Sequence, residues 1–346
     1  MMNRIINAVF FIFVSCFFSI LSYGEECSEI DLTKSAPESL VLHFELPFDQ
    51  SGRFCSSFVI ADLLSYDLGK SVSPYDVAYA IHSSKYARAR DNSNKKNIGM
   101  DQGGPGVENE TDILKALQER GLGVCPMKEM PAAWDQQRQH WEPYEAMMKE
   151  LLTIRKKIRT DKSFESYLKN IEDADCSLGV QSHIPLPVSE ILSILEAYRK
   201  KDLIDALEAM AQKTCANKYF PLDKNLILQE ESGRPITKVI DKVLEQVHKP
   251  MAWSFNTKHI DKVGGGPHEV SIIGRKKING QCMYVIRNSY GHNCDYYREP
   301  YKAHCDIRRG TLLFTKKEIE RWSLEMAGGD ADDMSVYYLD HAQRDK

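Results

Sequence analysis

The sequence lacks a surplus of basic residues, and it lacks the motifs of nucleic-acid-binding proteins. It has 45 lysines and arginines against 49 aspartates and glutamates in 346 residues, a net charge of −4, so we expect no nucleic-acid partner. None of its nine cysteines stands in a CxxC spacing, which argues against a zinc site. Internal repeats and low-complexity tracts are also absent. The composition is that of an ordinary globular protein, and nothing in it implies a metal or an organic cofactor.

Long apolar runs are absent beyond the N-terminus, so no later segment is expected to cross a membrane. The one such run, Ile5–Leu21, is followed by small residues at Ser22 and Gly24. This pattern predicts a signal peptide over residues 1–24. The run is long for a cleaved signal, so an uncleaved anchor stays open, while Cys16 within it has no lipobox. We expect an exported protein, periplasmic or extracellular, with no stable membrane insertion after cleavage.

Three residues far apart in the chain have the side chains of a thiolate nucleophile, its base and the group that orients the base. They are Cys55, His268 and Asn288. A free cysteine has a pKa of about 8.5, so little thiolate exists at neutral pH unless a neighbouring imidazole takes the proton. The imidazole must be held in one tautomer by a hydrogen bond from its other nitrogen, which an asparagine oxygen can accept. A nucleophilic hydrolase is therefore the leading hypothesis.

Local sequence patterns predict a hairpin that brings two of these side chains together. His268–Ile273 and Cys282–Arg287 have the composition of strands, and Asn279–Gly280 between them is a hairpin turn signal. The first residue of one strand and the end of the other meet at the open end of such a hairpin. His268 and Asn288 are therefore expected to lie close together.

The nucleophile is predicted to open a helix. Apolar residues at helical spacing over 56–68 predict a helix that Cys55 begins, and the positive potential of a helix N-terminus favours a thiolate. The polar stretch 25–42 is expected to form an irregular arm. The remaining predicted elements are helices over 74–80 and 112–120, a helix ending near 247, and strands over 306–314 and 337–339.

These segments resemble the papain-like cysteine peptidases. In that family a glutamine and a glycine-containing loop precede a cysteine that opens a helix. A histidine much later begins a strand, and Asn-Ser-Trp-Gly follows on the next strand. Here Gln50 and Gly52 precede Cys55, His268 follows much later, and Asn288 begins the segment Asn-Ser-Tyr-Gly. Within this family the chain most resembles bacterial-type members that carry a helical insertion.

The resemblance implies further site residues. Gln50 would supply the side-chain amide of the oxyanion hole, although five residues separate it from the cysteine where the family has six. The backbone of Gly103-Gly104 would pair with the backbone of the substrate. Tyr290, where the family usually has tryptophan, would shield the triad hydrogen bond from water.

Two further features depart from the family pattern. Ser56-Ser57-Phe58 stands where the family has Trp-Ala-Phe. Glu269 directly follows the histidine, and an inward carboxylate there would raise the pKa of the imidazole. We expect Glu269 to point outward, because successive residues of a strand face opposite sides.

The resemblance also implies an α+β, papain-like fold with two lobes and a cleft between them. It covers roughly residues 45–125 and 235–320. We expect a helical lobe over 25–125 that carries the nucleophile and an antiparallel β lobe over 235–346 that carries the histidine and the asparagine. Residues 126–234, rich in Glu, Lys, Leu, Ala and Met at helical periodicity, are expected to form an extra α-helical insertion.

The remaining cysteines fit export, because exported proteins can use them as disulfides. Setting aside Cys16 and Cys55 leaves seven, an odd number, so at least one is expected to stay free. We expect the pairs Cys294–Cys305, Cys176–Cys215 and Cys27–Cys125, with Cys282 free in a strand.

The leading hypothesis is an exported, monomeric thiol peptidase that acts on protein or peptide substrates. Family enzymes carry a long inhibitory pro-segment, but only about 30 residues separate the predicted cleavage site from Cys55. We therefore expect residues 126–234 to lie near the cleft and to restrict access or set substrate choice. The alternatives are a catalytically inactive binding protein on the same fold, a cell-wall amide hydrolase with the same triad and, more remotely, a structural adhesin.

Overall fold

The computed structural model of the chain describes residues 27–37, 40, 43–44, 55–83, 110–129, 134–135, 140–141, 212–262, 265–289, 294–330 and 334–342. Several predicted features lie outside these ranges. They are the signal peptide over 1–24, Gln50, Gly103, Gly104, Tyr290 and most of the insertion over 126–234. In the described ranges, no helix combines the length and the apolar character needed to cross a membrane.

Three helices pack together as one layer of the fold. They are α4 (Cys55–Leu68), α5 (Pro74–Ser83) and α7 (Glu110–Arg120), and they confirm three predicted helices. α4 is buried at every residue from Cys55 to Ser65. It is the central helix, because it packs against α5 and α7 on one side and against the sheet on the other.

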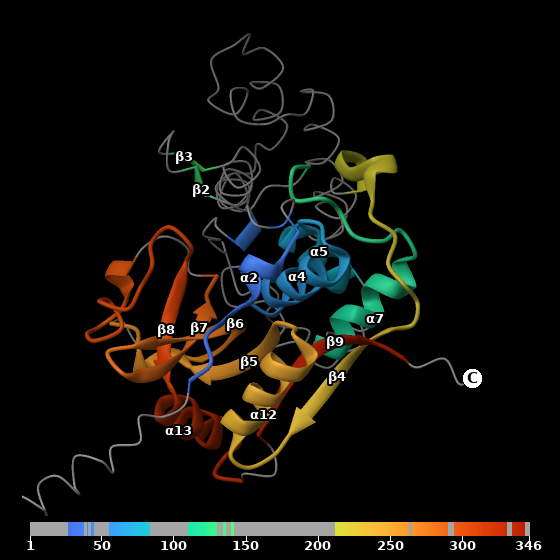
Figure 1. The fold of residues 1–346 in the computed structure, drawn as a ribbon. Coiled ribbons are helices and arrows are strands. Elements are labelled where there is room, and N and C mark those ends of the chain that lie inside the picture. The colour runs from blue at the N-terminus through green and yellow to red at the C-terminus, as the bar shows by residue number, and fades with distance from the viewer. Residues whose placement is uncertain are drawn as a thin grey trace, which may run out of the picture.

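An antiparallel sheet of seven strands forms the second layer (Figure 1). The strands follow the order β4-β9-β5-β6-β7-β8, and β1 pairs with β6 beside this path. The combination of helices and an antiparallel sheet makes the fold α+β, as predicted. The strands are β1 (Ile30–Asp31), β4 (Leu226–Ser232), β5 (Met251–Asn256), β6 (Pro267–Ile278), β7 (Gln281–Arg287), β8 (Thr311–Thr315) and β9 (Ser335–His341).

Two helical segments cover the face of the sheet opposite α4 (Figure 1). One is α12 (Ile236–Lys242), continued by the π-helical turn η4 (Val243–Val247), and the other is α13 (Lys316–Met326). α13 was not predicted, although its capping box of Thr315 and Glu318 is a readable start signal. The shorter elements are α2 (Leu32–Ser35), β2 (Trp134–Asp135), β3 (His140–Trp141), η3 (Ala216–Lys218), η5 (Thr257–His259) and η6 (Cys294–Tyr296).

The predicted hairpin is confirmed as β6 and β7. The two strands pair from Ser271 opposite Arg287 to Ile278 opposite Gln281, and Asn279 and Gly280 at the turn both have positive φ. β6 also accepts β1 at Gly274, where a Cβ would lie 2.2 Å from a backbone oxygen of β1. Only glycine allows this approach.

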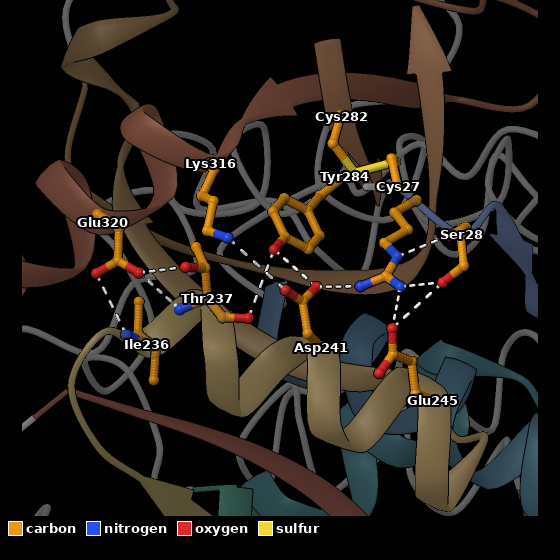
Figure 2. A network of polar contacts seen from close by, with 11 residues as sticks. Cys27, Ser28, Ile236, Thr237, Asp241, Glu245, Cys282, Tyr284, Lys316 and Glu320 are labelled. Carbon is orange, nitrogen blue, oxygen red and sulfur yellow. Dashed lines mark hydrogen bonds and ion pairs between the residues drawn. A yellow bond between two sulfur atoms is a disulfide. The ribbon is translucent and has the colours of Figure 1, made fainter. Parts of the chain in front are cut away.

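The N-terminal stretch is not an irregular arm, because it is fixed to the sheet and to α12 (Figure 2). The Arg275 guanidinium donates to the Ser28 carbonyl at 2.7 Å and to the Asp241 carboxylate at 2.5 Å, and it also contacts Glu245. The Tyr284 hydroxyl donates to Asp241 at 2.9 Å. These contacts bind the segment around Ser28 to elements more than 200 residues away in sequence.

Three disulfides join described cysteines, and only one was predicted correctly. Cys294–Cys305 is confirmed. The predicted pairs Cys27–Cys125 and Cys176–Cys215 are wrong, and Cys282 is not free. β1 pairs with β6 and thereby brings Cys27 beside β7, while the segment around residue 220 pairs with the segment after α7. These tertiary contacts give the actual pairs Cys27–Cys282 and Cys125–Cys215.

Part of the predicted insertion belongs to the main sheet. Residues 226–232 form β4, an edge strand that pairs along its whole length with β9. The sequence Leu-Ile-Leu-Gln-Glu-Glu-Ser has the apolar and polar residues of a half-buried edge strand, and burial alternates over residues 229–232. A helical segment in this region must therefore end before residue 226.

Candidate functional site

Cys55 is the first residue of α4 and lies at the boundary between the helices and the sheet. Its side chain is buried, with 8% of the residue exposed. Within the described ranges it is the free cysteine, since the other six are in disulfides. A helix N-terminus directs backbone N–H groups and positive potential toward such a sulfur.

His268 and Asn288 lie at the open end of the β6–β7 hairpin, as the sequence predicts. The His268 Nε2 and the Asn288 Oδ1 are 2.8 Å apart, and both residues are buried. Because Nε2 is engaged with Asn288, Nδ1 is the ring nitrogen that can face the sulfur of Cys55. Phe255, opposite His268 on β5, packs edge-on against the imidazole with ring centroids 6.2 Å apart. The imidazole is thus held from two sides.

The electrostatics of Cys55 depend on His268. Burial raises the pKa of the Cys55 thiol, but the hydrogen bond and the charge of His268 act in the opposite direction. Backbone N–H groups of Glu269 and Ser56 also stabilise the thiolate. The net effect lowers the pKa of Cys55 to about 7. A substantial fraction of the sulfur is therefore a thiolate at neutral pH.

Sequence reasoning missed a residue that orients the asparagine. The Asn288 Nδ2 donates to the Tyr297 hydroxyl at 2.9 Å. This bond leaves the amide oxygen of Asn288 directed at His268, because an amide has one donor end and one acceptor end. Tyr297 is buried just after η6, inside the loop closed by Cys294–Cys305. No motif marks it, since its role comes from the loop folding back on the hairpin.

The prediction that Glu269 points outward is wrong. The residue is 1% exposed, and both carboxylate oxygens lack a hydrogen-bond partner among the described residues. Burial, followed by the negative charge of Glu110, raises the pKa of Glu269 well above its usual value. The prediction failed because both faces of β6 are covered at this point, one by the core under α12 and α13 and the other by α4. A side chain on the face opposite His268 is therefore also buried.

A second buried polar cluster joins α4 to the hairpin, and we call it the Asp62 network. The Asp62 carboxylate accepts hydrogen bonds from the Ser271 hydroxyl at 2.9 Å and the Arg287 Nε at 3.2 Å, and it lies 2.9 Å from the His43 Nε2. The His43 Nδ1 contacts the Ser71 hydroxyl at 2.7 Å. Asp62 lies two turns after Cys55, and Arg287 directly precedes Asn288. The network therefore fixes the helix of the sulfur relative to the strand of the amide.

The Asp62 network could have been anticipated in part. Asp62 stands inside the apolar run Phe58–Leu64, and a lone carboxylate in a helix that is apolar on all sides requires a buried partner. The identity of that partner was not readable, since Arg287 is 225 residues away. No group of three His, Cys, Asp or Glu side chains in the described part could hold a metal ion.

No family model and no curated protein matches this chain. Among solved structures, it is similar to the Amb a 11 cysteine protease of ragweed pollen in its proform, with 12% identity over 93% of this chain and 68% of that one and a TM-score of 0.41. It is also similar to procathepsin B S9 from Trypanosoma congolense, with 13% identity over 92% of this chain and 79% of that one and a TM-score of 0.42. A third similar structure is procathepsin L 3 from the larval midgut of Tenebrio molitor, with 12% identity over 92% of this chain and 72% of that one and a TM-score of 0.37.

Proposed function

We propose that this protein is a cysteine-type peptidase that hydrolyses peptide bonds with Cys55, His268 and Asn288. The observation that carries the proposal is the chain of contacts from the Cys55 sulfur through the imidazole to the Asn288 amide, which Tyr297 orients. This is the arrangement of nucleophile, base and orienting group that acyl transfer requires.

In the proposed reaction the Cys55 thiolate attacks the peptide carbonyl. The imidazolium of His268 gives its proton to the leaving amine as the C–N bond breaks, and a thioester remains on the sulfur. Water, deprotonated by His268, then attacks the thioester, releases the carboxylic acid and restores the thiol. Backbone N–H groups at the start of α4 are directed toward this centre and would stabilise the developing oxyanion. We propose the side-chain amide of Gln50 as a second oxyanion donor. The backbone of Gly103-Gly104 is proposed to pair with the substrate backbone, and Tyr290 to shield the triad hydrogen bond from water.

Export is part of the proposal. Three disulfides among the described residues fit an oxidising compartment. Mass spectrometry of the N-terminus of the protein recovered from the extracellular or periplasmic fraction tests the predicted signal peptide. An N-terminus at Glu25 is expected, and retention of residue 1 in a membrane fraction would contradict cleavage.

The decisive experiment compares wild type with Cys55→Ala on a peptide library. We expect hydrolysis by wild type and at least about a 10³-fold loss in the variant. A correctly folded wild type that cleaves no peptide and does not react with a thiol-directed electrophile would contradict the proposal. Cleavage of peptidoglycan fragments in place of peptides would favour the amide hydrolase.

The pH dependence of Cys55 provides a separate measurement. Because the pKa of the thiol is lowered to about 7, the rate of alkylation by iodoacetamide should rise with pH and reach half its maximum near pH 7. Asn288→Ala should shift this midpoint upward, toward the value of an ordinary thiol. A midpoint that does not respond to Asn288 would contradict the coupling between the three side chains.

A further inference from the structure

The boundary between the helices and the sheet holds two carboxyls that the proposed reaction does not use. We propose that Glu269 and Glu110 form an acidic subsite that receives a basic side chain of the substrate, arginine foremost. The preferred substrates would then be peptides with a cationic residue close to the scissile bond. This inference rests on the proposed function, and it names the substrate class of the same site.

Glu269 is placed to act on a substrate held at Cys55. It follows His268 directly, and its backbone N–H contributes to stabilising the Cys55 thiolate. Its side chain is 1% exposed, and neither carboxylate oxygen makes a hydrogen bond of good geometry in the described ranges, although the side chains of Glu110 and Ser56 interact with it. A buried carboxyl without partners costs free energy. Such a group is expected where a ligand supplies the partner.

A cavity lies beside β5, the strand that pairs with β6 at Glu269. Ser254 stands directly opposite Glu269 in the β5–β6 pairing, so the two side chains project from the same face of the sheet. Ser254 and Glu110 line a cavity of about 200 Å³, and the other lining residues are Trp253, Ser323, Met326, Ala327, Met334, Ser335 and Tyr337. The cavity is large enough for one long side chain, and the carboxyl in its lining is that of Glu110, which interacts with Glu269.

Glu110 is the charged residue in the described lining of this cavity. Burial raises the pKa of Glu269, and the negative charges of Glu110 and of the Cys55 thiolate raise it further, so the surroundings favour the neutral carboxyl. Burial, followed by the negative charges of Glu230 and Glu110, raises the pKa of Tyr337 on the cavity wall. A cation between the two carboxyls would let Glu269 ionise and release its proton to water. The planar guanidinium of arginine can bond to both carboxylates at once, which favours it over lysine.

The test uses peptides in which arginine or its uncharged isostere citrulline is scanned through every position around the scissile bond. In wild type, the ratio of kcat/KM for arginine over citrulline should be at least about tenfold at one position. The ratio should fall to about one in Glu269→Gln and decrease in Glu110→Gln. A ratio taken within one enzyme cancels any effect of the substitution on the triad.

Glu230→Gln is the matched control. Glu230 is an exposed carboxylate 3.2 Å from the hydroxyl of Tyr337, so its removal deletes one negative charge beside the cavity but not in it. The ratio should stay at the wild-type value. An equal fall in Glu230→Gln would show a general field effect and would overturn the assignment of a subsite.

Proton release is a readout that a purely structural carboxyl pair would not give. Calorimetry of an arginine peptide binding to Cys55→Ala, in buffers of different ionisation enthalpy, should show proton release near neutral pH. The citrulline peptide should show none. Equal affinities for the two peptides without proton release would overturn the inference.

The failure of the subsite and the failure of the peptidase activity give different results. If wild type cleaves peptides but shows a ratio near one at every position, the subsite is wrong and the peptidase stands. If no peptide is cleaved, the proposed peptidase activity is wrong. The calorimetric comparison of the arginine and citrulline peptides then tests the subsite independently of activity. If Glu269→Gln does not fold, the wild-type ratio and Glu110→Gln still decide the outcome.

Discussion

Two carboxylates on either side of the boundary between α4 and the sheet have opposite surroundings. Asp62 is buried and accepts from Ser271 and Arg287, with His43 also within hydrogen-bond distance. Glu269, two residues from Ser271 on β6, is equally buried but makes no hydrogen bond of good geometry among the described residues. The charge of Arg287 and the hydrogen bonds from His43 and Ser271 lower the pKa of Asp62 despite its burial, whereas burial and the charge of Glu110 raise the pKa of Glu269. The first carboxylate holds the site together, and the second is available to a ligand.

The difference follows from what each carboxylate faces. Asp62 meets Arg287, which also donates to the backbone carbonyls of His43 and Phe44, so every charge in this cluster is compensated. Glu269 meets another carboxyl, Glu110. A buried ion pair with full hydrogen bonding tolerates its loss of hydration, while two facing carboxyls cannot both ionise.

The largest expected effect comes from Asp62→Ala. The substitution leaves the Arg287 guanidinium buried without its carboxylate, which costs about 3–5 kcal/mol of unfolding free energy. Urea or guanidinium denaturation of the two proteins measures the loss. A change below 1 kcal/mol, by the same measurement, would show that the Asp62 network contributes little to stability.

Glu269→Met is expected to change the unfolding free energy in the opposite direction. The substitution keeps the length of the side chain and removes the unsatisfied carboxyl. The variant should be more stable than wild type by about 1–3 kcal/mol at pH 7. The gain should shrink at acidic pH. The folded pKa of Glu269 is raised, so its penalty is absent below the unfolded pKa of about 4.3 and develops as pH rises toward the folded value. A destabilised Glu269→Met at pH 7 would mean that unseen partners satisfy the carboxyl.

The Asp62 network should have the reverse pH dependence. Burial lowers the pKa of His43, and Arg287 lowers it further, although Asp62 acts in the opposite direction. The stability contribution of a neutral buried histidine is present above its unfolded pKa of about 6.5 and is lost as pH falls toward the folded pKa. His43→Gln should therefore flatten the stability curve below pH 6.5, where wild type loses at most about 1.4 kcal/mol per pH unit through this group. Identical slopes of unfolding free energy against pH in wild type and His43→Gln would contradict this role of His43.

The elements that carry the candidate site were predictable because their signals are local. Helical spacing gave α4, and Asn279–Gly280 gave the β6–β7 hairpin that brings His268 beside Asn288. The residues that support the site were not predictable in the same way. Tyr297 reaches Asn288 through a loop without a motif.

Burial on both faces and long-range pairing explain the wrong predictions. Glu269 was placed outward by strand alternation, which fails where helices cover the second face of a strand. Cys27 and Cys282 are 255 residues apart, and only the pairing of β1 with β6 brings them together. Contacts of this kind depend on the whole fold, so no local pattern contains them.

The smallest expected change in unfolding free energy comes from Glu231→Gln. It tests whether burial determines how much a carboxylate contributes to stability. The Glu231 carboxylate lies 3.2 Å from the Lys242 ammonium, the same separation as between Asp62 and Arg287. The side chains of the first pair are 27% and 50% exposed, whereas those of the second are 4% and 2% exposed. Water and salt screen the exposed pair, so Glu231→Gln should change the unfolding free energy by less than about 0.5 kcal/mol. If denaturation shows that Glu231→Gln costs as much as Asp62→Ala, distance and not burial would determine what a carboxylate contributes in this protein.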